Sequence, residues 1–200
     1  MKKGITRLFS PIASIPALLF LLALGSCGPS VDSRNKMVVS VRDQKMLLLR
    51  DGKPVKAYDI STSKFGVGDT PNSNRTPLGR MRVAKKIGTG EPAGAVFKSR
   101  RPTGEVITPN APGRDPIVSR ILWLTGTQTE NRNAFRRYIY IHGTPEHKRL
   151  GTPASYGCIR MGCKDVVDLY NRVGTGADVY VIRGPIMTTP ETQRTYTAAR

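Results

Sequence analysis

Between residues 37 and 183, short runs of apolar residues alternate with polar ones, which is the pattern of half-buried β-strands. The runs fall at residues 37–42, 45–50, 55–61, 81–84, 121–124, 138–141 and 179–182. Asp43-Gln44 and Asp51-Gly52-Lys53-Pro54, which favour tight turns, separate the first three runs. The pattern therefore predicts that the domain begins with a meander of three strands that buries one face.

One later segment has the period of a helix. Val166, Leu169, Tyr170 and Val173 share one helical face, and Gly174 follows as a stop signal. Residues 88–119, by contrast, are rich in glycine and proline and show no clear pattern. A loop of that length is unusual in a compact domain, so we expect it to be functional or to contain short strands. Together these patterns predict a mainly β domain over residues 37–183 with one notable helix.

The two ends of the chain have other compositions. Residues 1–26 have the basic start, apolar run and small-residue end of an export signal peptide. Leu24-Gly25-Ser26-Cys27 resembles a bacterial lipobox, whose Cys is acylated and becomes the first mature residue. We therefore expect Cys27 to be lipidated and residues 27–36 to form a tether. The alternatives are an ordinary signal peptide or an uncleaved anchor. The polar residues 184–200 predict a flexible tail.

The positive net charge of the chain is consistent with the location that its export signal predicts. The chain has 32 Lys and Arg against 14 Asp and Glu, a formal charge of +18. Gly28 after the acylated Cys resembles the outer-membrane default in bacteria with two membranes. We expect a lipid-anchored protein of the cell envelope that faces the periplasm, where a basic body is attracted to anionic surfaces. Export and the lack of a nucleic-acid motif argue against a nucleic-acid partner, and no phosphate-binding glycine motif is present.

Two distant segments carry the best candidates for catalysis. The predicted strand at 138–141 delivers His142, and Cys158 lies in a glycine-containing turn ahead of the helix, where backbone N–H groups can stabilise a thiolate and an oxyanion. A thiol near its ordinary pKa needs a base within hydrogen-bond reach. His147 lies in a charged run, so His142 is the better candidate. The pair predicts acyl transfer, with a backbone carbonyl such as that of Gly143 orienting the imidazole.

These segments also carry a family resemblance. His142-Gly143-Thr144 followed by Ser155-x-Gly157-Cys158-Ile159-Arg160-Met161 resembles the signature of the L,D-transpeptidases, the YkuD-like catalytic domain. Thr76-Pro77-Leu78-Gly79 before a strand supports it. The resemblance covers residues 37–183 and implies an L,D-transpeptidase-like fold, a mainly β sandwich or mixed sheets with the notable helix after the catalytic Cys. It implies no cofactor and no metal.

The resemblance also implies a reaction on peptidoglycan stem peptides. Cys158 would attack the carbonyl of the third, diamino residue of a tetrapeptide and release the terminal D-Ala. The acyl group would then pass to an amine of another stem peptide or of an envelope protein. His142 would act as general base and acid, and the amides of Gly157 and Cys158 would line the oxyanion hole.

Three further residues complete the implied substrate site. Gly143 lets a substrate or backbone approach closely. Arg160 is placed to meet a peptide carboxylate or to buttress the loop. Tyr156 stands where the family often has His, and we interpret that departure as a change in the substrate site rather than as a loss of the base.

Other interpretations of the same residues stay open. Cys158 could be a buried structural thiol. Cys163 is expected to be structural, with a redox partnership to Cys158 as its alternative. His142, His147, Cys158 and Cys163 together would suit a zinc site, which we consider a weaker explanation than catalysis. The whole chain could also be a hydrolase that uses the same thiol with water, or a non-catalytic wall-binding lipoprotein.

Overall fold

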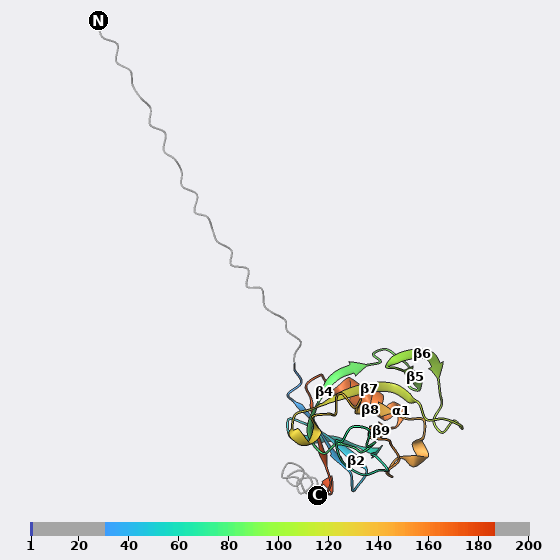
Figure 1. Ribbon diagram of the computed structural model, residues 1–200. Coiled ribbons are helices and arrows are strands. Elements are labelled where there is room, and N and C mark those ends of the chain that lie inside the picture. The colour runs from blue at the N-terminus through green and yellow to red at the C-terminus, as the bar shows by residue number, and fades with distance from the viewer. Residues whose placement is uncertain (2–30, 187–200) are drawn as a thin grey trace.

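The computed structural model describes Met1 and residues 31–186 (Figure 1). The expected signal peptide after Met1, Cys27, which we expect to be lipidated, and residues 187–200 of the expected tail lie outside the described residues. No helix within the described part of the chain is long and apolar enough to span a bilayer.

Strands make up most of the described chain, and one α-helix follows the ninth of them. The strands are β1 (Asn35–Ser40), β2 (Lys45–Arg50), β3 (Lys53–Ser61), β4 (Gly79–Ile87), β5 (Ala95–Lys98), β6 (Arg101–Val106), β7 (Ile117–Gly126), β8 (Tyr140–Gly143), β9 (Ile159–Met161) and β10 (Asp178–Ile182). The helices are α1 (Cys163–Arg172) and the short 3-10 turns η1 (Thr129–Asn131) and η2 (His147–Arg149).

The strands form one mixed sheet that closes on itself. Their order in the sheet is β4-β10-β1-β2-β3-β9-β8-β7-β5-β6. An additional pairing between β4 and β7 closes the first eight strands of this order into a ring. The β1–β10 and β8–β9 pairs are parallel and the others are antiparallel. The β5–β6 hairpin lies outside the closed ring and projects from one side of the molecule (Figure 1).

The interior of the ring holds the main hydrophobic core. Alternation in β10 buries Val179 and Val181, and the apolar stripe of α1 buries Val166, Leu169 and Tyr170 in the same cluster. The helix packs against β7 and β8. This packing holds α1 beside β8, the strand that carries His142.

The predicted class, mainly β with one notable helix, is confirmed. The pattern missed three strands. β6 has every residue exposed and contains Pro102 and Gly104, so it carries no apolar alternation. β5 and β6 lie in the segment at 88–119 that we expected to hide short strands. β9 has only three residues and follows Cys158 directly, too short to show a pattern, and α1 begins at Cys163, close to where its apolar stripe predicted it.

Candidate active site

His142 and Cys158 reach the same region because β8 and β9 are neighbours. The two strands pair in parallel, with His142 opposite Arg160. Cys158 immediately precedes β9 and therefore lies beside Tyr140, at the start of β8. The fold thus brings the segments of His142 and Cys158, 16 residues apart in sequence, side by side.

His142 is a buried, neutral imidazole with one nitrogen left free. Only 6% of the surface of His142 is exposed to solvent. Its Nδ1 lies 2.9 Å from the carbonyl oxygen of Gly143, so the proton resides on Nδ1, which donates to that oxygen. Among the described residues, Nε2 has no hydrogen-bond partner. Burial lowers the pKa of His142 to about 4, against the opposing effect of the Gly143 hydrogen bond.

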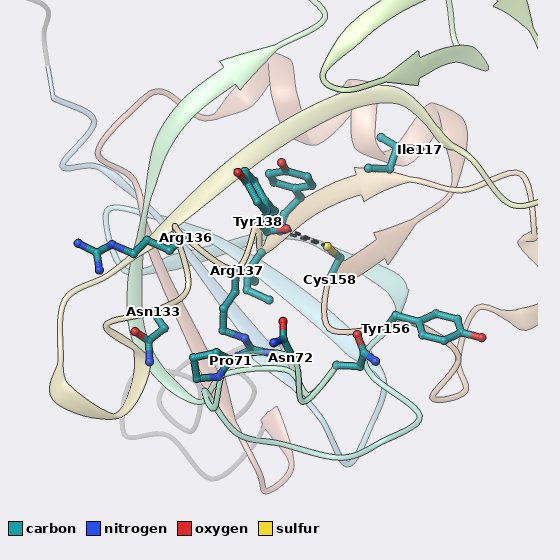
Figure 2. Close-up of a pocket in the computed structure, with 12 residues that line it drawn as sticks. Pro71, Asn72, Ile117, Asn133, Arg136, Arg137, Tyr138, Tyr156 and Cys158 are labelled. Carbon is teal, nitrogen blue, oxygen red and sulfur yellow. Dashed lines mark hydrogen bonds between the residues drawn. The ribbon is translucent and has the colours of Figure 1, made fainter.

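The thiol of Cys158 is hydrogen-bonded to the main chain of β8 and of the residues before it. Sγ accepts from the N–H of Tyr140 at 3.4 Å and donates to the carbonyl oxygen of Tyr138 at 3.4 Å (Figure 2). Burial raises the pKa of Cys158 to about 11, and the Tyr140 hydrogen bond opposes this rise. The expectation that the turn's own amides stabilise a thiolate is therefore not met in the free protein. No hydrogen bond within the described chain joins this thiol to His142.

Tyr138 holds its carbonyl toward the thiol through an unusual backbone conformation. Its φ is +58°, in the left-handed region that non-glycine residues rarely adopt. The sequence pattern placed Tyr138 in a strand, but β8 begins only at Tyr140. Strained backbone of this kind persists where the surroundings enforce it, and here Tyr138 packs against Trp123 with ring centroids 5.5 Å apart.

Two cavities meet at Cys158. The larger is a cleft of about 630 Å³, and the smaller is a pocket of about 140 Å³. Both are lined by Ile117, Tyr156 and Cys158. His142 lines only the smaller one, so the imidazole and the thiol face a common space there. Figure 2 shows the larger cleft, with the sulfur of Cys158 at its wall and the ring of Tyr156 turned away from the sulfur.

A family model for the YkuD L,D-transpeptidase catalytic domain matches residues 34–181, which is most of the chain. The chain belongs to this family. No curated protein matches the sequence closely enough to count as a relative.

Solved structures of L,D-transpeptidases are similar to this YkuD domain. L,D-transpeptidase 3 from Mycobacterium tuberculosis has a TM-score of 0.50 at 19% identity, covering 75% of this chain and 61% of that one. The enzyme from Xylanimonas cellulosilytica gives 0.49 at 17%, with 77% and 63% covered. That from Mycobacterium smegmatis gives 0.48 at 15%, with 74% and 58% covered. The chain spans about 60% of the length of these proteins, and likeness at this identity indicates the fold alone.

The two glycines of the YkuD motif have different surroundings. Gly157 has a φ of +118°, which only glycine adopts without strain, and its N–H donates to Oγ of Ser155 at 3.2 Å. The N–H of Cys158 takes part in no hydrogen bond among the described residues. Gly143 lines neither cavity. A Cβ there would lie 2.6 Å from the carbonyl oxygen of Val118, so close approach of backbone explains this glycine.

Tyr156 and Arg160 flank the smaller pocket. Tyr156 is 59% exposed, and its hydroxyl accepts from Nζ of Lys64 at 2.9 Å, an interaction that lowers the pKa of the tyrosine. Arg160 is buried and pairs with Asp115 at 2.5 Å and with Glu146 at 3.1 Å. Of the two roles expected for Arg160, this geometry corresponds to buttressing the loop.

Sequence reasoning missed several residues around the site. Asp115 lies in the segment at 88–119, where no pattern marks it. Arg137 lines the larger cleft and forms a buried ion pair with Asp69 at 3.0 Å. It also donates to the carbonyl oxygen of Arg75, so it ties the loop before β4 to the segment before β8. The basic run at Arg136-Arg137 was the only visible signal, and it does not reveal the partner.

The remaining thiol and imidazole have local structural contacts. His147, expected in a solvated loop, accepts the N–H of Cys163 at 3.0 Å through Nε2 and so caps the start of α1. Cys163 is buried, and its thiol donates to the carbonyl oxygen of Thr144. Both Cys158 and Cys163 are free thiols. Within the described residues no three His, Cys, Asp or Glu side chains are grouped to hold a metal ion.

Proposed function

We propose that this YkuD domain is a peptidoglycan L,D-transpeptidase in which Cys158 is the nucleophile and His142 the general base and acid. The observation that carries the proposal is the pocket shared by the thiol and a buried imidazole whose Nε2 has no hydrogen-bond partner in the described part of the chain. The substrate is a stem tetrapeptide, which the thiol attacks at the carbonyl of the third residue. The terminal D-Ala leaves, and an amine of another stem peptide or of an envelope protein accepts the acyl group.

The pKa values of the two groups favour a mechanism in which the thiol loses its proton only as it attacks the substrate. With a Cys158 pKa of about 11 and a His142 pKa of about 4, both groups are neutral at physiological pH. Sγ must exchange its contact with the Tyr138 carbonyl for one with Nε2 of His142 when substrate enters. His142 then takes the thiol proton as the carbon–sulfur bond forms and gives it to the departing D-Ala nitrogen.

The unused N–H of Cys158 is suited to stabilise the negative oxygen of the tetrahedral intermediate. A donor of this kind acts where charge develops and costs nothing to orient, because the turn already fixes it. The N–H of Gly157 contributes if its bond to Ser155, 3.2 Å long in the free protein, opens. The larger cleft is the side on which a stem peptide fits, since about 630 Å³ is within the range of small-ligand sites.

The direct test is incubation with disaccharide-tetrapeptide followed by intact-protein mass spectrometry. We expect a mass gain equal to the stem without D-Ala in the protein, and no gain in Cys158→Ala. Adding an amine acceptor should then give a cross-linked product. A mass gain in Cys158→Ala would contradict the assignment of the nucleophile, and free tripeptide as the sole product would identify a carboxypeptidase that uses the same thiol.

We propose further that the protein is a lipoprotein anchored through Cys27 in the cell envelope and facing the periplasm, at the outer membrane in a bacterium with two membranes. The support is the sequence Leu24-Gly25-Ser26-Cys27 followed by Gly28. Metabolic labelling with an alkyne fatty acid tests this directly. Label should enter the protein and not Cys27→Ser, and equal labelling of both would contradict the anchor.

A further inference from the structure

Thr76 begins the segment Thr76-Pro77-Leu78-Gly79, and no step of the proposed reaction uses it. The residue is fully buried, and its hydroxyl is hydrogen-bonded on two sides. Oγ1 accepts the N–H of Ser63 at 3.0 Å and donates to the carbonyl oxygen of Gly157 at 3.0 Å. A main-chain N–H only donates and a hydroxyl has a single proton, so the proton of Thr76 is directed at Gly157.

The carbonyl of Gly157 belongs to the same peptide unit as the N–H of Cys158. A trans peptide unit is planar, so its C=O and its N–H point in opposite directions. The hydrogen bond to the buried Thr76 therefore turns the N–H of Cys158 away from that threonine. This N–H has no hydrogen-bond partner among the described residues. Because Cys158 lines both cavities, the N–H is available to a substrate oxygen there.

The glycine at position 157 makes an external restraint on this peptide unit necessary. Its φ of +118° is open to a residue without Cβ, and the same freedom lets the following peptide unit rotate easily. Ser155 restrains the neighbouring units, because its Oγ accepts the N–H of Gly157 at 3.2 Å and donates to the carbonyl oxygen of Cys158 at 2.5 Å. Neither bond involves the C=O of Gly157 or the N–H of Cys158. Within the described chain, Thr76 alone bonds to that unit through a side chain.

Thr76 is itself mounted on a fixed stretch of main chain. Its N–H donates to the carbonyl oxygen of Gly66 at 3.1 Å, and its own carbonyl oxygen accepts the N–H of Gly68 at 2.9 Å. The carbonyl oxygen of the preceding residue, Arg75, accepts from Arg137 at 2.7 Å. The hydroxyl of Thr76 therefore cannot withdraw from the turn without breaking main-chain hydrogen bonds as well.

We propose that Thr76 is a positioning residue for the oxyanion hole, and that its hydroxyl holds the Gly157–Cys158 peptide unit so that the N–H of Cys158 faces the oxygen that becomes negative during acylation. This inference rests on the proposed function, in which that N–H stabilises the tetrahedral intermediate. Thr76 acts through the peptide unit and touches no reacting atom. Its effect is therefore confined to reactions in which a carbonyl oxygen gains charge, and attack by the same thiol on a saturated carbon should not depend on it.

The test compares two reactions of Cys158 at one pH. p-Nitrophenyl acetate acetylates the thiol through a tetrahedral oxyanion and releases nitrophenolate, whereas iodoacetamide alkylates it by displacement at a saturated carbon. Thr76→Val keeps the branched shape and removes the hydroxyl. Acetylation should slow about 10- to 100-fold in this variant, because one oxyanion donor is misaligned, and alkylation should stay within about twofold. Nitrophenolate release, with Cys158→Ala as the blank, measures the first rate, and peptide mass spectrometry at Cys158 measures the second.

The tetrapeptide gives a second comparison of the same variants. For Thr76→Val the kcat of acylation should fall while KM stays within about twofold, since the lost interaction is made only in the transition state. Thr76→Ser retains the hydroxyl and should recover most of both the acetylation rate and kcat. An equal slowing of acetylation and alkylation, or no slowing of either, overturns the positioning role.

Thr62→Val is the matched control. Thr62 is also fully buried, and its hydroxyl oxygen accepts from Nε2 of Gln44 at 2.7 Å rather than contacting the turn. This variant should keep the wild-type ratio of the two rates even where it loses stability. Thr76→Ala is a second variant without the hydroxyl, for use where Thr76→Val does not fold. It should show the same selective loss of acetylation, and a wild-type ratio in it overturns the proposal.

A measurement on the wild-type protein requires no variant to fold. The hydroxyl proton of Thr76 should give its own NMR resonance in water, with a scalar coupling to the carbonyl carbon of Gly157. A hydroxyl proton that exchanges too fast to be observed overturns the hydrogen bond on which the inference depends. Failure of the tetrapeptide to acylate wild-type Cys158 is a different result. It overturns the proposed function, whereas the comparison with p-nitrophenyl acetate still decides the role of Thr76.

Discussion

The thiol of Cys158 donates to the carbonyl oxygen of Tyr138, a residue whose φ of +58° turns that carbonyl toward the sulfur. The contact occupies the thiol proton, and no hydrogen bond among the described residues joins the thiol to His142. Burial raises the pKa of Cys158 and lowers that of His142, so both partners of the expected catalytic pair are neutral near pH 7.

Alkylation of Cys158 should report this state. Because burial raises the thiol pKa to about 11, the rate of reaction with iodoacetamide should keep rising well beyond pH 9. The measurement uses Cys27→Ser with Cys163→Ser, so that Cys158 is the single thiol left among the three of the sequence. A midpoint below pH 8 would mean that the thiolate is stabilised in the free protein.

His142 should make the protein less stable in acid. Its folded pKa of about 4 lies below the ordinary value of 6.5, so the unfolded chain takes up the proton first as pH falls. The free energy of unfolding therefore decreases as the pH falls from about 6.5 to about 4. The protonation of His142 lowers it by up to about 3 kcal/mol in total and has no further effect below about pH 4. Urea denaturation of wild type and His142→Gln at several pH values tests this. The variant should show a flatter dependence, and parallel curves would contradict it.

Arg137 should contribute strongly to stability. Its pair with Asp69 has side chains only 8% and 7% exposed, so Arg137→Met leaves a buried carboxylate without its partner and should cost about 3–5 kcal/mol. Arg34→Met is the matched control, because its pair with Asp51 is exposed and should contribute less than about 1 kcal/mol. Urea denaturation compares them. Similar losses in the two variants would show that burial of the Asp69 pair has no special cost.

Gly143→Ala tests the close packing that supports the imidazole. The added Cβ would lie 2.6 Å from the carbonyl oxygen of Val118 and 3.0 Å from Cγ1 of Val166. Displacement of the strand should cost about 1–3 kcal/mol of stability and move the carbonyl that holds Nδ1 of His142. Thermal denaturation and the rate of Cys158 acylation measure both effects. Unchanged stability and acylation would show that β8 accommodates the methyl group freely.

The elements that could be predicted are those whose own residues carry an apolar pattern. β2 is a short apolar run between polar ends, β10 is rich in β-branched residues, and the stripe of α1 recurs at helical spacing from Val166 to Tyr170, so these elements could be predicted. β6 is exposed along its whole length and β9 is only three residues long. Those strands exist because neighbouring strands supply hydrogen bonds, and a period in the sequence cannot reveal such a partner.

The candidate site divides in the same way. His142 and Cys158 could be predicted, since each stands in a distinctive short motif, and so could the Gly143 carbonyl as the partner of Nδ1. Asp115 could not, because its role depends on Arg160 arriving from another strand. The protonation state of the Cys158 thiol could not be predicted from the sequence either, because its high pKa comes from burial that only the folded structure creates.

The place of β10 in the sheet has a consequence for how the molecule is made. This last strand inserts between β1 and β4, pairing in parallel with the first strand and antiparallel with the fourth. The ring of hydrogen bonds stays open until nearly all of the domain is available to fold. Contacts of such long sequence separation slow folding, and a chain truncated before residue 178 lacks the strand that joins β1 to β4, so it should be degraded rather than accumulate in a partly folded form.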